Sequence, residues 1–119
     1  MDEKDLKERT KQFALRVMRL VDELPNSVSG RAIAGQLVRA GTSVGANYRA
    51  TCRAFTTPMF LSKLAIVVEE ADETAYWLEL IRDAGLVKPE QIRDLLDEAD
   101  QILRIMVSSQ MTASHKHKS

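Results

Sequence analysis

The sequence predicts an all-α protein, an antiparallel four-helix bundle of up-down-up-down topology. Only five glycines and three prolines occur among 119 residues, which leaves little material for a turn-rich β fold. Four segments carry apolar residues at the three- and four-residue spacing of a helix. The short links between them require successive helices to turn back on one another. The length suits one domain, so we expect the bundle over residues 1–112 and a disordered basic tail over residues 113–119.

The first two helices are expected over about residues 2–24 and 29–55. Pro25 and Asn26 follow the first apolar stripe and mark its end. In the second helix one apolar face begins at Ile33 and ends at Phe55, so Phe55 is expected in the core.

The last two helices have clear start and stop signals. Thr57 is expected to be the N-cap of the third helix, with Pro58 at its first helical position, and Gly85 closes this helix after residue 84. Pro89 begins the fourth helix, whose apolar pattern continues to about Met111.

Cysteine content and hydropathy together predict a cytoplasmic protein. The single cysteine, Cys52, excludes an internal disulfide and suits a reducing compartment. It lies on the flank of the expected core face, which is typical of an inert thiol. The first eleven residues mix basic with acidic side chains, and no apolar run approaches ~18 residues, so we expect neither a signal peptide nor a membrane partner.

The residues do not form a recognisable catalytic or metal-binding set. A di-iron bundle needs glutamates from two helices and Glu-x-x-His from the other two. The glutamates of residues 69–73 could supply carboxylates, but the two histidines, His115 and His117, fall in the expected tail. The cysteine and the serines therefore also lack a histidine base within the folded region. We expect no enzymatic activity, no cofactor and no metal.

Charge is divided unequally along the chain. Residues 1–54 hold ten Lys/Arg and six Asp/Glu, a net charge of +4, whereas residues 55–112 hold five and eleven, a net charge of −6. No carboxylate occurs between Glu23 and Glu69. On a helical wheel, the arginines of the second helix fall within an arc of about 80° that lies opposite its apolar face. These arginines are Arg31, Arg39, Arg49 and Arg53; from the first helix, Arg16 and Arg19, with Arg9, could widen this basic surface.

The arginines favour one of two kinds of partner. The planar fork of a guanidinium matches two phosphate oxygens, so the basic face predicts contact with the backbone of RNA or DNA. The few aromatic residues give little sign of base recognition, because they are assigned to the core. Alternatively, the basic face meets the acidic third and fourth helices of the same or a neighbouring chain.

Two further features concern self-association. Gly41 and Gly45 interrupt the second helix and predict a close approach of another helix, either within the protomer or across a subunit boundary. The third helix carries a second stripe, well over 90° from its core stripe, formed by Ile66, Glu73, Trp77 and Leu80. A second stripe that includes tryptophan favours an oligomer interface, although a wide core face within one protomer would also explain it.

Two strings of residues are similar to those of a known family. The first is Gly41-Thr42-Ser43-Val44-Gly45-Ala46-Asn47-Tyr48-Arg49, and the second is Glu69-Glu70-Ala71-x-Glu73-Thr74-x-Tyr76-Trp77-Leu78. With Leu61-x-Lys63-Leu64 between them, they resemble the 23S rRNA intervening-sequence proteins over roughly residues 6–110.

The resemblance implies a small bacterial four-helix protein whose relatives assemble as homopentamers. Some members are encoded within insertions in large-subunit rRNA genes. A related branch comprises accessory proteins of diversity-generating retroelements, which bind nucleic acid and a reverse transcriptase. Two positions depart from the family pattern: Ala50 replaces a common acidic residue and Val68 a common lysine, so any pairing of those groups across a subunit boundary must differ here.

The leading hypothesis is a non-enzymatic homo-oligomer that binds nucleic acid, chiefly RNA, through phosphate contacts of the arginine face. The alternative is a homo-oligomeric scaffold or adaptor that binds a protein partner and has no nucleic-acid role. Whether acidic side chains occupy the arginine face distinguishes the two.

Overall fold

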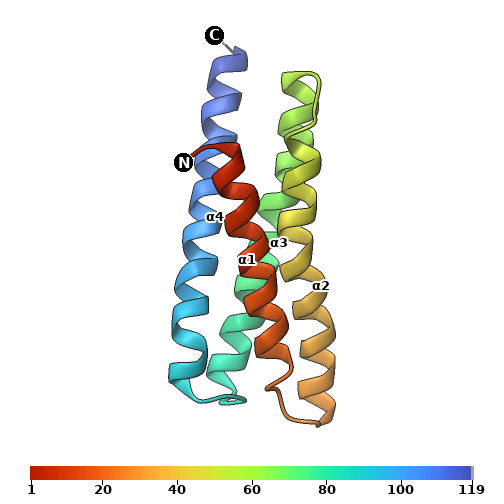
Figure 1. The fold of residues 1–119 in the computed structure, drawn as a ribbon, viewed down its shortest axis with the longest axis vertical. Coiled ribbons are helices and arrows are strands. Elements are labelled where there is room, and N and C mark those ends of the chain that lie inside the picture. Colours follow the sequence, from red (N-terminus) through yellow and green to blue (C-terminus); the bar gives the residue numbers. More distant parts are fainter. Residues whose placement is uncertain (119) are drawn as a thin grey trace.

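A computed structural model describes residues 1–118 and shows four α-helices and no strand within that range (Figure 1). The helices are α1 (Glu3–Val21), α2 (Val28–Thr51), α3 (Thr57–Asp83) and α4 (Pro89–Lys118). The molecule is elongated, with extents of 50 × 21 × 20 Å. The prediction of an all-α protein with four helices is therefore confirmed.

Each helix packs against two neighbours. In Figure 1, α1 and α3 run towards the lower end of the molecule, and α2 and α4 run back towards the upper end. Contacts join α1 to α2, α2 to α3 and α3 to α4, and a less extensive contact between α1 and α4 closes the ring. Because α1 is the shortest helix, the upper end of the molecule consists of the α2–α3 link and the last turns of α4 (Figure 1).

Side-chain caps fix where the helices begin. Asp2 accepts a hydrogen bond from the backbone N–H of Asp5 at 2.9 Å and starts α1, and Ser27 accepts one from Gly30 at 3.0 Å and starts α2. The predicted cap of α3 is wrong by one residue. Thr56 is the N-cap because it has the extended backbone and accepts from the N–H of Met59 at 3.2 Å.

Gly85 ends α3 as the sequence predicts. Its φ of 65° is a left-handed conformation that glycine adopts without steric cost. Its N–H donates to the carbonyl of Arg82, and the N–H of Leu86 donates to that of Ile81, each at 3.1 Å. These two bonds form a Schellman motif and satisfy carbonyls that the helix leaves unpaired.

Two helix ends differ from the sequence-based expectation. Helix α2 ends at Thr51 rather than near Phe55, because residues 52–56 form the turn that positions Thr56 as the cap of α3. Phe55 is consequently 91% exposed, and its predicted place in the core is wrong. Helix α4 continues to Lys118 rather than ending near Met111, so residues 113–118 of the predicted tail are helical. No glycine or proline follows Pro89 to stop the helix; residue 119 of the predicted tail lies outside the described residues.

The core is a single column of side chains contributed by all four helices. It confirms the predicted apolar stripes, apart from Phe55. The larger buried side chains are Leu6, Phe13, Val17, Leu20, Leu37, Val44, Tyr48, Leu64, Val67, Leu78, Ile81, Ile92, Leu95, Ile102 and Met106.

Gly41 and Gly45 bring α2 close to α1 within the protomer. A Cβ atom built on Gly41 would lie 2.8 Å from Cγ1 of Val17, and one on Gly45 would lie 3.1 Å from the hydroxyl oxygen of Thr10. Both glycines are buried. The tight contact that they predict is therefore intramolecular, and their predicted role in an oligomer interface is corrected, since α1 already covers them.

Candidate nucleic-acid interface

Arg31, Arg39 and Arg49 of α2 and Arg53 of the turn after it are all exposed, but their surroundings differ. Arg39 is held by two glutamates of α3: its Nη1 lies 3.2 Å from Oε2 of Glu70, and its Nη2 lies 2.5 Å from Oε2 of Glu73. The hydrogen bond from Arg39 lowers the pKa of Glu73, which also accepts a bond from the indole N–H of Trp77 at 3.3 Å. The same contact raises the pKa of Arg39. The acidic helix of the same chain thus neutralises one of the four predicted arginines.

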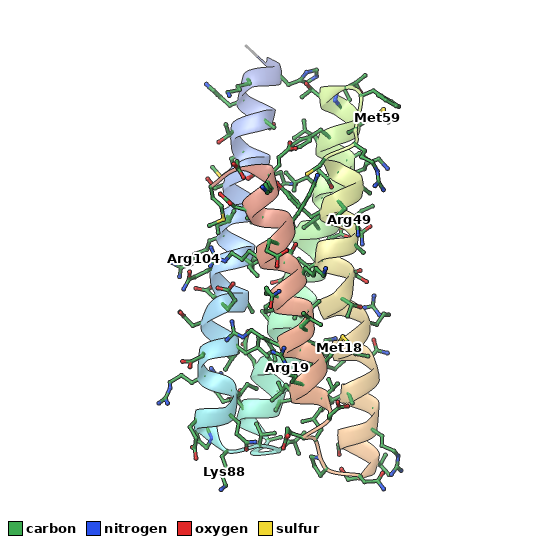
Figure 2. All side chains as sticks on the ribbon, viewed as in Figure 1. Met18, Arg19, Arg49, Met59, Lys88 and Arg104 are labelled. Carbon is green, nitrogen blue, oxygen red and sulfur yellow. The ribbon has the colours of Figure 1, made fainter. Side chains whose placement is uncertain are left out.

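The other arginines of α2 keep their charge available. Arg31 donates to the side-chain oxygen of Asn26 at 2.8 Å, and that amide carries no charge. Arg49 and Arg53 are exposed, and neither forms an ion pair or a side-chain hydrogen bond within residues 1–118. Figure 2 shows Arg49 on the outward side of α2. The open part of the predicted basic face therefore consists of Arg31 at the start of α2 and of the pair Arg49 and Arg53 towards the α2–α3 end.

The arginines of α1 face α4 instead of joining this surface. Arg9 makes a bidentate contact with Glu98, with distances of 2.8 Å from Nε and 2.7 Å from Nη2, and Nη2 also donates to Gln101 at 2.8 Å. The hydrogen bond to Glu98 raises the pKa of Arg9. This pair fixes α1 against α4 and removes Arg9 from any basic surface.

Arg16 and Arg19 follow the same side of α1. They line an open groove of about 400 Å³ between α1 and α4, together with Leu20, Glu23, Glu90, Gln91, Asp94 and Leu95. The acids of α4 recur every four residues at positions 90, 94 and 98, which places them on one face of that helix. Arg16 and Arg19 thus lie beside carboxylates rather than beside Arg49 and Arg53, and their contact with phosphates stays a prediction.

Two lysines of α1 that the sequence analysis missed extend the open surface. Thr10 of α1 lies against Gly45, so α2 runs along this side of α1. Lys7 lies one helical turn before Thr10, and Lys11 lies one turn after Lys7. Both lysines are exposed and form no ion pair within the described residues. The positive charge of Lys7 opposes the rise in the pKa of the Cys52 thiol, so Lys7 lies near the end of α2.

We call Lys7, Lys11, Arg49 and Arg53 the α1–α2 basic surface. Glu3 borders this surface, because its negative charge contributes to the raised pKa of the Cys52 thiol. The signal that could have revealed the lysines is their four-residue spacing beside the apolar stripe of the first helix.

The groups between these two helices do not form a reactive site. Burial raises the pKa of the Cys52 thiol, so it stays protonated at neutral pH and is a poor nucleophile. Burial likewise raises the pKa of the neighbouring Tyr48. Among residues 1–118, no three His, Cys, Asp or Glu side chains are placed to hold a metal ion. Over the same residues, every helix is too short or too polar to cross a membrane.

The second stripe of α3 is partly open. Ile66 is 43% exposed, Trp77 is half-buried against the core, and Leu80 is half-buried. Tyr76 is 55% exposed and meets Trp77 edge-on, with ring centroids 5.3 Å apart. Glu73 of this stripe is engaged with Arg39, as described above. The stripe is apolar enough to receive another surface, and its role as an oligomer interface stays a prediction.

These features define a class: small all-α proteins of four helices, without a recognisable catalytic set in the described residues, that carry a basic outer surface. The chain belongs to the 23S rRNA-intervening sequence protein family, whose pattern it matches over residues 3–108. This match confirms the resemblance stated above.

A solved structure agrees with the family and the fold. The crystal structure of a protein with unknown function from the S23 ribosomal protein family of Bacteroides thetaiotaomicron superposes with a TM-score of 0.81. The two chains are 32% identical, and the alignment covers 88% of this chain and 97% of the other. No curated protein matches this chain.

Proposed function

We propose that this protein is a non-enzymatic RNA-binding bundle that contacts phosphates through its α1–α2 basic surface and acts as a homo-oligomer, a pentamer as in the relatives that its sequence resembles. The observation that supports this function is the open state of Arg49 and Arg53. Both are exposed, and within residues 1–118 neither is neutralised by an acid. Membership of the 23S rRNA-intervening sequence family makes RNA the first polyanion to test.

The chemistry of this surface suits a phosphate backbone without base specificity. Arg49 lies in the last turn of α2, and Arg53 follows it by four residues in the turn after the helix. Each guanidinium can donate two parallel hydrogen bonds to one phosphate, and the neighbouring lysines add point charges. If all four cations displace counterions, log K should fall with log salt at a slope of about −3 for single-stranded RNA, a loss of about 50-fold between 50 and 200 mM salt.

Self-association would strengthen a modest surface. Each added protomer brings another copy of the four cations, and simultaneous contacts raise avidity without new chemistry. The partly open stripe of α3 is the surface that we assign to subunit contact, because it combines exposed Ile66 and Tyr76 with half-buried Trp77. Sedimentation equilibrium gives the assembly mass, and a monomer at all concentrations would contradict this part of the proposal.

RNA binding is tested with a fluorescent, unstructured RNA by anisotropy at several salt concentrations. The double variant Arg49→Gln/Arg53→Gln should bind more weakly and show a salt slope that is shallower by about 1.4, since two phosphate contacts are removed. The matched control is Arg93→Gln/Arg104→Gln, which changes the net charge equally on the exposed side of the acidic α4. No binding by the wild type at 50 mM salt, or an equal loss in the control, would contradict the proposal.

A scaffold or adaptor that binds a protein partner is the second candidate. It is favoured by the ion pairs of Arg39 with Glu70 and Glu73, which show acidic side chains of α3 meeting part of the basic face. An oligomer that forms normally but has no affinity for RNA at 50 mM salt would favour this function over the first.

A further inference from the structure

Phe55 has the highest exposed fraction among the large apolar side chains of the described residues. At 91% it is nearly as accessible as in an unfolded chain, although the ring is fully apolar. Burying a phenylalanine is worth about 1.5–3 kcal/mol, and nothing in the protomer provides that gain. A partner outside the protomer that covers the ring would supply this gain.

The backbone holds this ring in a defined place. In the turn after α2, the N–H of Arg53 donates to the carbonyl of Ala50, and that of Ala54 donates to the carbonyl of Thr51, each at 3.1 Å. On the other side of Phe55, the hydroxyl of Thr56 caps α3 by accepting from Met59. The ring thus stands on a turn anchored between two long helices, at the end of the bundle that Met59 marks in Figure 2.

The surroundings of the ring identify the partner. Arg53 precedes Phe55 by two residues and Arg49 by six, and both guanidinium groups are free of ion pairs within the described residues. No carboxylate occurs between Glu23 and Glu69, so no acid of the same turn repels a polyanion. An exposed apolar ring with cations close to it along the chain is the combination that binds single-stranded nucleic acid, with bases stacked on the ring and phosphates on the cations.

We propose that the α2–α3 turn binds unpaired nucleotides of RNA, with one base stacked on Phe55 and the adjoining phosphates held by Arg49 and Arg53. This inference rests on the proposed RNA-binding function and adds a selectivity to it. In a duplex both faces of each base are stacked on its neighbours, so the ring gains nothing, whereas an unpaired base presents a free face. The protein therefore prefers single-stranded RNA to duplex RNA of equal charge.

The test compares a 24-nucleotide unstructured RNA with a 12-base-pair RNA duplex, which carries nearly the same number of phosphates, at 100 mM salt. Phe55→Leu keeps an apolar side chain and removes the ring, so single-strand affinity should fall by about 5- to 150-fold, the range for one lost stacking contact, while duplex affinity stays unchanged. Phe55→Trp should restore single-strand binding. Val28→Ala is the matched control, because it removes another highly exposed apolar side chain, at the opposite end of α2 and outside the surface assigned to subunit contact, and it should leave both affinities unchanged.

Further measurements separate the possible outcomes. The thermal midpoint of Phe55→Leu should equal that of the wild type, since an exposed ring contributes little to folding. Unchanged single-strand affinity, or an equal loss on both RNAs, would overturn the inference while leaving the proposed function intact. A changed assembly mass with unchanged RNA affinity would show that the ring meets a second copy of the chain instead. If the wild type binds neither RNA at 50 mM salt, the proposed function itself fails.

Discussion

Substituting Gly41 by alanine tests the close contact between α1 and α2. The added Cβ would lie 2.8 and 2.9 Å from the two Cγ atoms of Val17, and 3.2 Å from its Cβ. Real Cβ atoms do not approach other carbons this closely, so something must move. Val17 is completely buried and branched at Cβ, which prevents it from turning away easily. Overpacking of this kind destabilises a core by about 1–3 kcal/mol.

A second glycine in the same helix supplies the reference. Gly35 is exposed, and no atom lies within 4 Å of the Cβ that alanine would add there. Gly35→Ala should therefore stabilise the protein by about 1 kcal/mol, because alanine favours the helix over glycine by that amount. Gly41→Ala gains the same propensity but suffers the overlap, so its net effect should range from about zero to 2 kcal/mol of destabilisation. The difference between the two variants measures the overlap alone, about 1–3 kcal/mol.

The assay is urea unfolding followed by far-UV circular dichroism, with the protomer concentration held constant because assembly would shift the midpoint. Val17→Ala in the Gly41→Ala background removes the colliding methyl groups, so the double variant should be more stable than the sum of the single effects by about 1–3 kcal/mol. Stabilisation of Gly41→Ala equal to that of Gly35→Ala would refute the reasoning, since it would mean that α1 does not lie against this glycine.

Three other predictions concern single groups. Arg39 lowers the pKa of Glu73, so the contribution of this pair is complete above the unfolded pKa of about 4.3 and is lost as the pH falls through the lower folded value. The stability difference between the wild type and Glu73→Gln should accordingly narrow between pH 7 and pH 3 in urea unfolding; a constant difference would exclude the pair. Gly85→Ala should destabilise the protein by about 1 kcal/mol, because alanine is strained at a φ of 65°. Gly85→Asn should lose less stability than Gly85→Ala, because asparagine tolerates this conformation better. If both variants were as stable as the wild type, the left-handed turn would be contradicted. Because burial raises the pKa of Cys52, iodoacetamide should modify it several times more slowly in the native protein than in urea at pH 7.5, and equal rates would show an open thiol.

Much of the fold could be predicted from the sequence, because a helix depends on residues close together in the chain. The three- and four-residue spacing of apolar side chains located all four helices and most of the core. Helix ends were less certain. Thr56 and Thr57 are equally good caps by residue type, and only the backbone of the turn decides between them. Phe55 fits the helical period of α2, but the helix ends four residues before it.

The candidate site was predicted less well, because it depends on which helices become neighbours. A helical wheel places Arg39 and Arg49 on one face, yet it cannot show that α3 brings two glutamates to the first and no acid to the second. Arg16 and Arg19 were assigned to the same surface as the arginines of α2, whereas they face the acidic side of α4. Lys7 and Lys11 join the surface only because α1 packs against the glycines of α2.

The sequence by itself determined the four helices, their buried faces and membership of the 23S rRNA-intervening sequence family. Each of these is a property of local spacing or of residue strings, and helical hydrogen bonds form within one segment. The tertiary structure decided which charges remain available. The partners of Arg39 and Arg9 lie 31 and 89 residues away along the chain, so the pairs exist only after the helices are packed in one register. Electrostatic attraction depends on distance in space, and that distance is set by the packing of the core.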